Sequence, residues 1–257
     1  MEEINMLKFD IQVVRNREGK IMMPVVETFL SLNGEGLDSG KPSVFIRLQG
    51  CNLRCNYNDI TKLCDTPEGL AFPQRCSRSN YTYMSAKSLA EQVTNLKAKR
   101  ICLTGGEPLA REGIAEFIKD LTENLAEDVK IEIETNGSIN LEKTFKYIPK
   151  PKNVIFTLDY KSKSSGEELK MDLSNWEYLG KEDAIKFVVS NKEEMEKAVK
   201  LLKQIKPLAQ PIFSPMFGKI DLQEMWEFVY NPEVIDLDIK AQVQLHKIVY
   251  SPDVKGV

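Results

Sequence analysis

The chain has 257 residues, of which 42% are hydrophobic and 28% are charged, and these values exclude collagen-like, coiled-coil and wholly disordered chains. The formal net charge of −3 gives no support to nucleic-acid binding by bulk electrostatics. Five cysteines, an odd number, fit a disulfide framework poorly, and the single histidine, His246, excludes histidine-rich zinc sites.

The N-terminus lacks the features of a secretory signal. It carries acids at positions 2 and 3 and no apolar run of the kind that forms the centre of such a signal. No apolar run further along approaches the ~18 residues of a membrane-spanning helix. We therefore expect a cytoplasmic protein with reduced thiols, with neither membrane nor nucleic acid as a partner.

Short β-rich segments recur along the chain at intervals that leave room for helices. They comprise residues 44–48, 100–104, 130–134, 153–158, 184–189, 211–214 and 241–249. Apolar residues at helical spacing fill three of the intervals: Leu89, Val93 and Leu96; then Ile114, Phe117, Ile118, Leu121 and Leu125; then Met195, Val199, Leu202 and Ile205. Ser85 and Asn191 are the expected N-caps, and Asn191 forms a capping box with Glu194. The alternation predicts βαβ units and a parallel sheet, in an α/β fold.

Ligands of such sheets bind beyond the carboxyl ends of the strands. The residues at these ends are polar, rich in glycine and include a cysteine: residues 50–51, 104–107, 134–137, 159–161 and 214–215. Residues 56–83 differ, because they are rich in turn formers and lack clean periodicity. We expect this segment to be an insertion or a long functional loop near the site.

Three cysteines lie close together after a predicted strand. Cys51, Cys55 and Cys64 fall within the segment GCNLRCNYNDITKLCDT. Three thiolates can bind three irons of a [4Fe–4S] cube and leave the fourth iron open to a small molecule. Zinc with Cys76 as a fourth thiolate, and plain reduced cysteines, are the competing interpretations. Cys102 lies inside a predicted strand and is expected to be a core residue.

Two further features have chemical meaning. Gly105 and Gly106 allow the backbone to approach a ligand closely, and Glu107 beside them can accept a hydrogen bond from an ammonium group. Arg47 lies in an otherwise apolar strand, so it needs either a buried partner or an anionic ligand.

The motifs ETFLSLNGEG, VFIRLQGCNLRC, CDT and LTGGEP together resemble the radical S-adenosylmethionine (SAM) superfamily. Five later segments extend the match over most of the chain: IEIETNG, TLDYKSKSSG, IKFVVSN, FSPMFGK and VQLHKIVYSPDVKGV. The first motif and the QLHK segment resemble, more narrowly, the 7-carboxy-7-deazaguanine synthase family. The resemblance implies a single domain, residues 1–257, with a partial (β/α)6 TIM-like barrel and a cluster-binding loop at residues 50–66.

The cysteine spacing departs from the superfamily pattern. That pattern is C-x3-C-x2-C, whereas this chain has Asn58 at the third position and C-x3-C-x8-C up to Cys64. The tripeptide Cys64-Asp65-Thr66 resembles the family's Cys-Asp-Thr, with six residues inserted before it. We therefore assign Cys64 as the third cluster ligand and keep Cys76 as the alternative.

The resemblance implies a role for each matching position. SAM is expected to contact Leu63, Asp65, Gly105, Gly106, Glu107, Asp159, Tyr160, Lys161 and Ser214. The substrate is expected to contact Leu32, Asn33, Gly34, Glu35, Arg47, Thr104 and His246. Thr66 resembles the family's Mg²⁺ ligand. Asn33 stands where the family generally has Gln, so the amide is shorter by one methylene.

The implied reaction is the ring contraction of 6-carboxy-5,6,7,8-tetrahydropterin to 7-carboxy-7-deazaguanine, with loss of ammonia, in queuosine precursor synthesis. A lyase of this kind uses a [4Fe–4S] cluster, SAM and Mg²⁺, takes electrons from a flavodoxin or ferredoxin, and forms a homodimer. Two alternatives stay open. A glycyl-radical activating enzyme would share the cysteine loop and GGEP, and a diverged, non-enzymatic metal-binding scaffold would account for Asn58.

Overall fold

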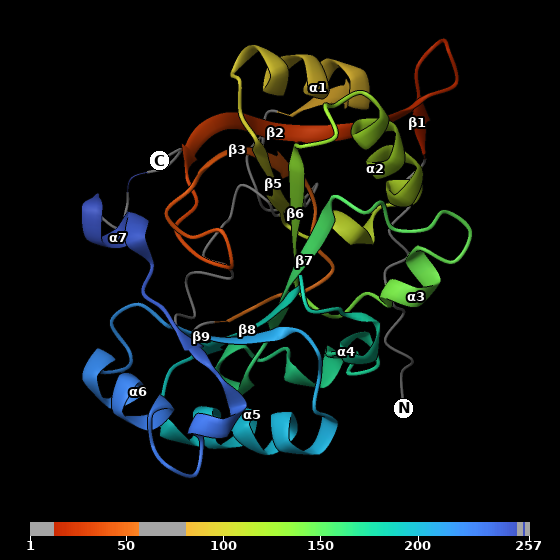
Figure 1. The fold of residues 1–257 in the computed structure, drawn as a ribbon. Helices are drawn as coiled ribbons and strands as arrows, with labels where there is room; N and C mark the ends of the chain where they lie inside the picture. The colour runs from red at the N-terminus through yellow and green to blue at the C-terminus, as the bar shows by residue number, and fades with distance from the viewer. Residues whose placement is uncertain (1–12, 57–80, 251–253, 255–257) are drawn as a thin grey trace.

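The structure, a computed structural model, describes residues 13–56, 81–250 and 254 (Figure 1). Most of the expected insertion at 56–83 lies outside the described residues. So do five residues with expected roles: Leu63, Cys64, Asp65, Thr66 and Cys76. The last two residues of that segment, 82–83, belong to a strand and not to a turn-rich loop.

The described strands form one sheet. They are β1 (Val14–Arg15), β2 (Ile21–Leu32), β3 (Pro42–Leu48), β4 (Thr82–Ser85), β5 (Arg100–Gly105), β6 (Lys130–Thr135), β7 (Val154–Tyr160), β8 (Ala184–Val189), β9 (Gln210–Pro215) and β10 (Lys240–Ala241). Their order is β1-β2-β3-β5-β6-β7-β8-β9-β10, and β4 pairs with β2. Neighbours from β3 to β10 are parallel, whereas β1, β2 and β4 add an antiparallel extension.

Seven α-helices lie within the described parts of the chain. They are α1 (Ala86–Asn95), α2 (Ile114–Glu123), α3 (Leu141–Thr144), α4 (Asn175–Tyr178), α5 (Lys192–Ile205), α6 (Leu222–Val229) and α7 (Leu245–Val249). Figure 1 shows α1 to α6 around one side of the curved sheet, whereas α7 lies apart from them. Six parallel strands, of which β5 to β9 are each followed directly by a helical segment, and a sheet that does not close confirm the partial barrel. None of the helices in the described ranges is long and apolar enough to cross a membrane.

The alternation of residues along each parallel strand separates an apolar face from a polar one. In β6, Ile131 and Ile133 belong to the hydrophobic core. Glu132 and Glu134 alternate with them and therefore point to the other face of the sheet. Buried polar side chains on a strand need partners, so this second face is where a site is expected.

Local signals at helix starts are confirmed. The Ser85 hydroxyl accepts from Ser88 N at 3.2 Å at the start of α1. The Asn191 side chain accepts from Glu194 N at 3.0 Å at the start of α5. The capping box is altered, however, because the Glu194 carboxylate accepts from Ser190 N at 2.8 Å. The helix is thus tied to the end of β8.

The expected strand at residues 241–249 is wrong. Its pairing with β9 stops after Ala241, and Gln242 N makes a last bond to the Phe213 carbonyl at 3.0 Å. Residues 245–249 instead form α7, whose first amide, Leu245 N, donates to Gly34 O at 3.1 Å. Beyond Ala241 the described residues contain no further pairing with a neighbouring strand. The backbone amides of residues 245–249 are therefore satisfied within α7 and by the loop between β2 and β3. The long strand β2 was not among the predicted segments.

Candidate active site

The cysteine loop follows β3 directly. Gly50 at its start has φ +98°, a region that favours glycine. Cys51 Sγ accepts hydrogen bonds from Leu53 N at 3.4 Å and from Asn136 Nδ2 at 3.8 Å. Cys55 lies on the same loop and is buried. Burial raises the pKa of the Cys51 thiol, so a metal ion is needed to make the thiolate the favoured form at neutral pH.

Bonds to other strand ends hold this loop in place. Asn136, after β6, donates to Asn52 Oδ1 at 3.0 Å, and Asn52 donates to the Ser138 hydroxyl at 2.8 Å. Arg54 N donates to Glu167 Oε1 at 2.7 Å, in the segment after β7. The two described cysteines of this loop, Cys51 and Cys55, are therefore fixed at the carboxyl ends of the strands. Within the described ranges no group of three metal-binding side chains gathers, and the third expected ligand, Cys64, lies outside them.

Gly105, at the end of β5, is required by close packing. Gly105 has φ +143°, and a Cβ atom there would lie 2.1 Å from Leu48 O. Gly106 N donates to the same carbonyl at 3.1 Å. The loop can follow this path only without a side chain at position 105.

Glu107 joins two strand-end loops. It is 1% exposed, and its carboxylate accepts from Leu109 N at 2.9 Å, from the Thr135 hydroxyl at 2.8 Å and from Asn136 N at 2.6 Å. Burial raises its pKa to about 7, although these hydrogen bonds favour the charged form. Glu107 was expected to accept from an ammonium group. In the structure, its described partners are donors of the protein itself, which seat Asn136 beside Cys51.

A network of ion pairs occupies the polar face of the sheet. Lys186 Nζ in β8 lies 2.9 Å from Glu35 Oε2 and 3.1 Å from Asp159 Oδ1. Lys161 Nζ lies 2.9 Å from Asp159 Oδ2, and the Ser214 hydroxyl donates to Glu35 Oε1 at 2.9 Å. The fold thus brings together four residues that were expected at the site: Glu35, Asp159, Lys161 and Ser214.

These contacts keep Glu35 ionised. Burial by itself raises the pKa of Glu35, but Lys186, Gln244 and Ser214 outweigh it and lower that pKa to about 2. Burial also opposes the charge on Lys186, yet Asp159 and Glu35 hold its pKa well above the usual value. The site therefore contains a fixed carboxylate acceptor beside a fixed ammonium donor.

The first loop, between β2 and β3, covers this face. Asn33 is buried, and its amide donates to Glu132 Oε2 at 2.7 Å. Gly34 packs on His246, since a Cβ atom at Gly34 would lie 2.2 Å from His246 Nδ1. Burial lowers the pKa of His246, which favours the neutral imidazole. The Leu32 side chain is exposed. His246 was expected at a strand end, but it reaches the loop from α7.

Two expected substrate residues already have protein partners. The Thr104 hydroxyl donates to Glu134 Oε2 at 2.8 Å. Arg47 Nε donates to Glu27 Oε1 at 2.7 Å, and these two residues are register partners in β3 and β2. Glu27 is the partner that an arginine in an apolar strand requires, and it leaves the remaining guanidinium donors for another group.

Tyr160 lies on the opposite face from Asp159. Its ring packs against Trp176 and Phe187, with centroids 5.9 and 5.4 Å away, on the side of the helices. Its hydroxyl donates to Glu168 Oε1 at 3.0 Å. A contact between Tyr160 and a ligand on the polar face would therefore have to come from its backbone.

Four residues of the polar face had no predicted role: Glu132, Lys186, Gln242 and Gln244. Glu134 was expected only as part of the strand end 134–137. The sequence did contain a signal for these residues: charged side chains that interrupt otherwise apolar strands, as in KIEIET and AIKFVV. Such a residue cannot stay buried without a partner, so its spacing alone marks the polar face.

Unsatisfied polar atoms on this face test whether a polar ligand fits. Gln242 Nε2 and Gln244 Oε1 are buried and have no hydrogen-bond partner among the described residues, and Asp159 Oδ1 has only its ion pair with Lys186. Asp159 belongs to the expected SAM positions, and Gln244 lowers the pKa of Glu35. A ligand with both donors and acceptors would satisfy these atoms. The residues present therefore fit SAM and a pterin, and the cysteine loop at the same edge fits the cluster.

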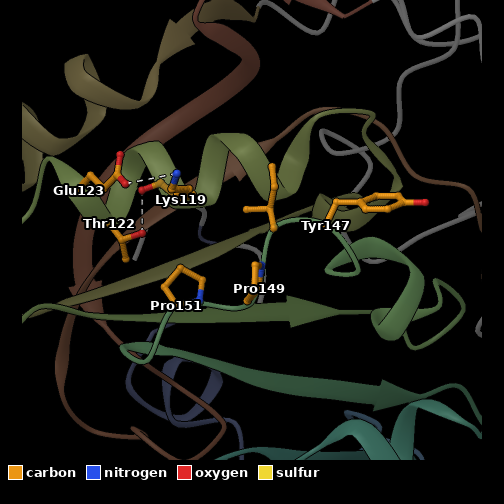
Figure 2. Close-up of a pocket in the computed structure, with 7 residues that line it drawn as sticks. Lys119, Thr122, Glu123, Tyr147, Pro149 and Pro151 are labelled. Atoms are coloured by element: carbon orange, nitrogen blue, oxygen red, sulfur yellow. Dashed lines mark hydrogen bonds and ion pairs between the residues drawn. The ribbon is translucent and has the colours of Figure 1, made fainter.

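An open crevice elsewhere is unrelated to these residues. It is lined by Lys119, Thr122, Glu123, Tyr147, Ile148, Pro149 and Pro151 (Figure 2). Lys119 pairs with Glu123 at 3.6 Å, and both side chains are exposed. The crevice lies between the end of α2 and the segment before β7, at the amino-terminal ends of the strands. It is thus opposite the candidate site.

Comparison with known proteins agrees with this geometry. The Radical SAM superfamily model matches residues 45–229. A 7-carboxy-7-deazaguanine synthase of Clostridium acetobutylicum is 38% identical over 235 residues, covering 91% of this chain and 98% of that protein. The synthase of Methanospirillum hungatei is 32% identical, covering 90% and 86%.

A solved structure shows the same fold. The crystal structure of QueE from Escherichia coli matches with a TM-score of 0.65 at 21% identity, covering 88% of this chain and 95% of that one. The chain belongs to the radical SAM superfamily and, within it, to the 7-carboxy-7-deazaguanine synthase family.

Proposed function

We propose that this chain is a radical SAM lyase that converts 6-carboxy-5,6,7,8-tetrahydropterin to 7-carboxy-7-deazaguanine with loss of ammonia, in queuosine precursor synthesis. The observation that carries the proposal is the 2.9 Å hydrogen bond from Ser214 to Glu35. It joins a strand end expected to contact SAM with the loop expected to contact the substrate. Family membership supports the same reaction.

As a radical SAM enzyme, the chain uses a [4Fe–4S] cluster and SAM. When bound, they supply the radical that takes a hydrogen atom from the substrate. Cys51, Cys55 and Cys64 would hold the cluster. The backbone of Gly105 and Gly106 would approach the methionine end of SAM.

The polar face would orient the pterin. Glu35 is ionised and accepts hydrogen bonds, so it suits the N–H groups of the ring. Arg47 would bind the substrate carboxylate with the guanidinium donors not used by Glu27. Thr104 and the neutral His246 would complete the contacts. Thr104 is buried and the other three residues are partly buried, which strengthens their electrostatic contacts relative to those of fully exposed groups.

The remaining components follow from the family. We propose that Thr66 helps to bind Mg²⁺, whose few protein ligands leave room for substrate oxygens and water. A flavodoxin or ferredoxin would supply the electron, and two copies would form a homodimer. Reduced cluster cysteines suit the cytoplasm.

The test is turnover by anaerobically reconstituted protein. We expect conversion of the pterin to 7-carboxy-7-deazaguanine, and loss of both turnover and the absorbance near ~400 nm in Cys51→Ala. Cys102→Ala is the matched control, because Cys102 is a buried cysteine outside the loop and should leave the iron content unchanged. Turnover by the Cys51→Ala variant would contradict the proposal.

Thermal unfolding with and without the pterin, and analysis of the bound metal and sulfide, separate the alternatives. A glycyl-radical activating enzyme would bind the cluster but would not be protected against heat by the pterin. A non-enzymatic scaffold would retain zinc without sulfide. The names of the curated relatives favour the synthase over both.

A further inference from the structure

Lys186 has no assigned role in the reaction proposed above, yet it stands at the centre of the ion-pair network. Its side chain is 6% exposed and projects from β8 beside its register partner Asp159 in β7. Its Nζ contacts Glu35 Oε2 at 2.9 Å and Asp159 Oδ1 at 3.1 Å. One buried ammonium thus joins two carboxylates that come from distant parts of the chain.

The two carboxylates belong to different subsites. Glu35 lies in the expected substrate loop, and Asp159 is an expected SAM contact. Asp159 Oδ1 pairs with Lys186 and has no further partner among the described residues, so it retains capacity for a ligand donor. In a buried site of low dielectric, any displacement of Asp159 changes the pull of Lys186 on Glu35.

We infer that Lys186 is a positioning residue that couples the SAM subsite to the pterin subsite, so that each ligand tightens the binding of the other. The inference rests on the proposed function. A ligand that fixes either carboxylate also fixes the ammonium between them, which lowers the entropic cost of ordering the second subsite. By linkage, the two ligands tighten each other by the same factor.

A second lysine–carboxylate pair, in which the carboxylate is buried and the lysine partly buried, provides a control. Lys150 Nζ lies 3.4 Å from Asp183 Oδ1, and the Asp183 side chain is 2% exposed. Asp183 accepts from Phe156 N at 2.7 Å, near the amino-terminal ends of β7 and β8. Lys150→Met therefore removes a lysine from a buried carboxylate at the end of the sheet opposite the site.

The experiment measures the dissociation constant of SAM for anaerobic, cluster-loaded protein with and without saturating 6-carboxypterin. This oxidised probe keeps the ring and the carboxylate of the substrate. The ratio of the two constants is the coupling factor. We expect a factor of about five or more in the unaltered chain and in Lys150→Met, and a factor of about one in Lys186→Met. A merely structural lysine would lower stability and leave this factor unchanged.

The inference is wrong if Lys186→Met folds and shows the same coupling factor as Lys150→Met. It is also wrong if the unaltered chain shows a coupling factor of one. If Lys186→Met does not fold, the binding of 6-carboxypterin to the Asp159→Asn variant tests the inference instead. Weaker 6-carboxypterin binding in Asp159→Asn without SAM supports the coupling, and unchanged binding overturns it. Failure of the proposed function is a separate result, because 6-carboxypterin would then not bind to the unaltered chain and no product would form.

Discussion

The side-chain amide of Asn33 donates a 2.7 Å hydrogen bond to Oε2 of Glu132, across a separation of 99 residues in the chain. The other Glu132 oxygen accepts from the Thr157 hydroxyl at 2.5 Å. A Cβ atom at Gly36 would lie 2.6 Å from Glu132 Oε1, so the loop descends directly onto this carboxyl. In this structure the shorter amide of Asn33 is directed at the sheet, and it fixes the loop between β2 and β3 to the sheet.

This burial predicts a pH dependence of stability. Burial, reinforced by Glu134, raises the pKa of Glu132 from 4.5 to about 7. Between these values the folded chain binds more protons than the unfolded chain, so the free energy of unfolding falls as pH rises. The stabilisation is full below pH ~4.5 and is lost as pH rises through about 7.

Glu132→Gln should remove much of this dependence, because the amide stays neutral. Its oxygen can still accept from Asn33, and its NH2 group can donate to the Thr157 hydroxyl, which then acts as the acceptor. Thermal or urea unfolding at several pH values between ~5 and ~8 measures the free energy of unfolding. Across this range we expect Glu132 to contribute a fall on the order of 3 kcal/mol, which the variant should lack. Glu107, whose pKa is also about 7, should leave a residual slope of the same sign. An unchanged slope in Glu132→Gln would contradict the prediction.

Gly105→Ala should destabilise the fold severely. The new Cβ atom would lie 2.1 Å from Leu48 O, in a backbone region reserved for glycine. We expect a loss of at least ~3 kcal/mol, or insoluble protein. Gly180→Ala is the control, since its nearest contact would be Asp183 Oδ2 at 3.8 Å and its φ is not positive. Equal melting temperatures for the two variants would refute the argument.

Cysteine replacement should identify the third cluster ligand. We expect Cys64→Ala to lose iron and sulfide after anaerobic reconstitution, as Cys51→Ala does, because two thiolates cannot hold the cube. Cys76→Ala should retain both. The opposite result, with iron lost only in Cys76→Ala, would reassign the third ligand to Cys76.

Arg47→Met should raise the KM for the pterin by about tenfold or more, because a charged hydrogen bond to the carboxylate is lost. The dissociation constant of SAM should change little. Glu27→Gln is the control: it removes the salt-bridge partner at 2.7 Å but leaves Arg47 in place. If Arg47 only pairs with Glu27, the two variants will show the same KM.

Much of the fold could be read from local pattern. Strands β3 and β5 to β9 lie where alternating or continuous apolar runs predicted them, because burial of both faces leaves a strong compositional trace. The caps at Ser85 and Asn191 are equally local, since each depends on a backbone amide three residues away. The glycine-rich strand ends likewise indicated which edge of the sheet holds the site.

The edges of the sheet could not be read in this way. Residues 241–249 alternate like a strand, yet whether they form one depends on a neighbour with free backbone groups. Past Ala241 the chain leaves β9 and turns into α7, which carries His246 to Gly34. The face on which Tyr160 lies was decided in the same way, by its aromatic neighbours in α4 and β8.

The sequence by itself determined the parallel α/β architecture, the cysteine loop and the strand ends at which the candidate site lies, because each depends on residue types at short, regular spacing. Only the tertiary structure decided that Lys186 joins Glu35 to Asp159 and that Asn33 rests on Glu132. These partners are far apart in the chain, and the register of neighbouring strands brings them together. A buried charge reveals that it needs a partner, but only the folded sheet determines which one it has.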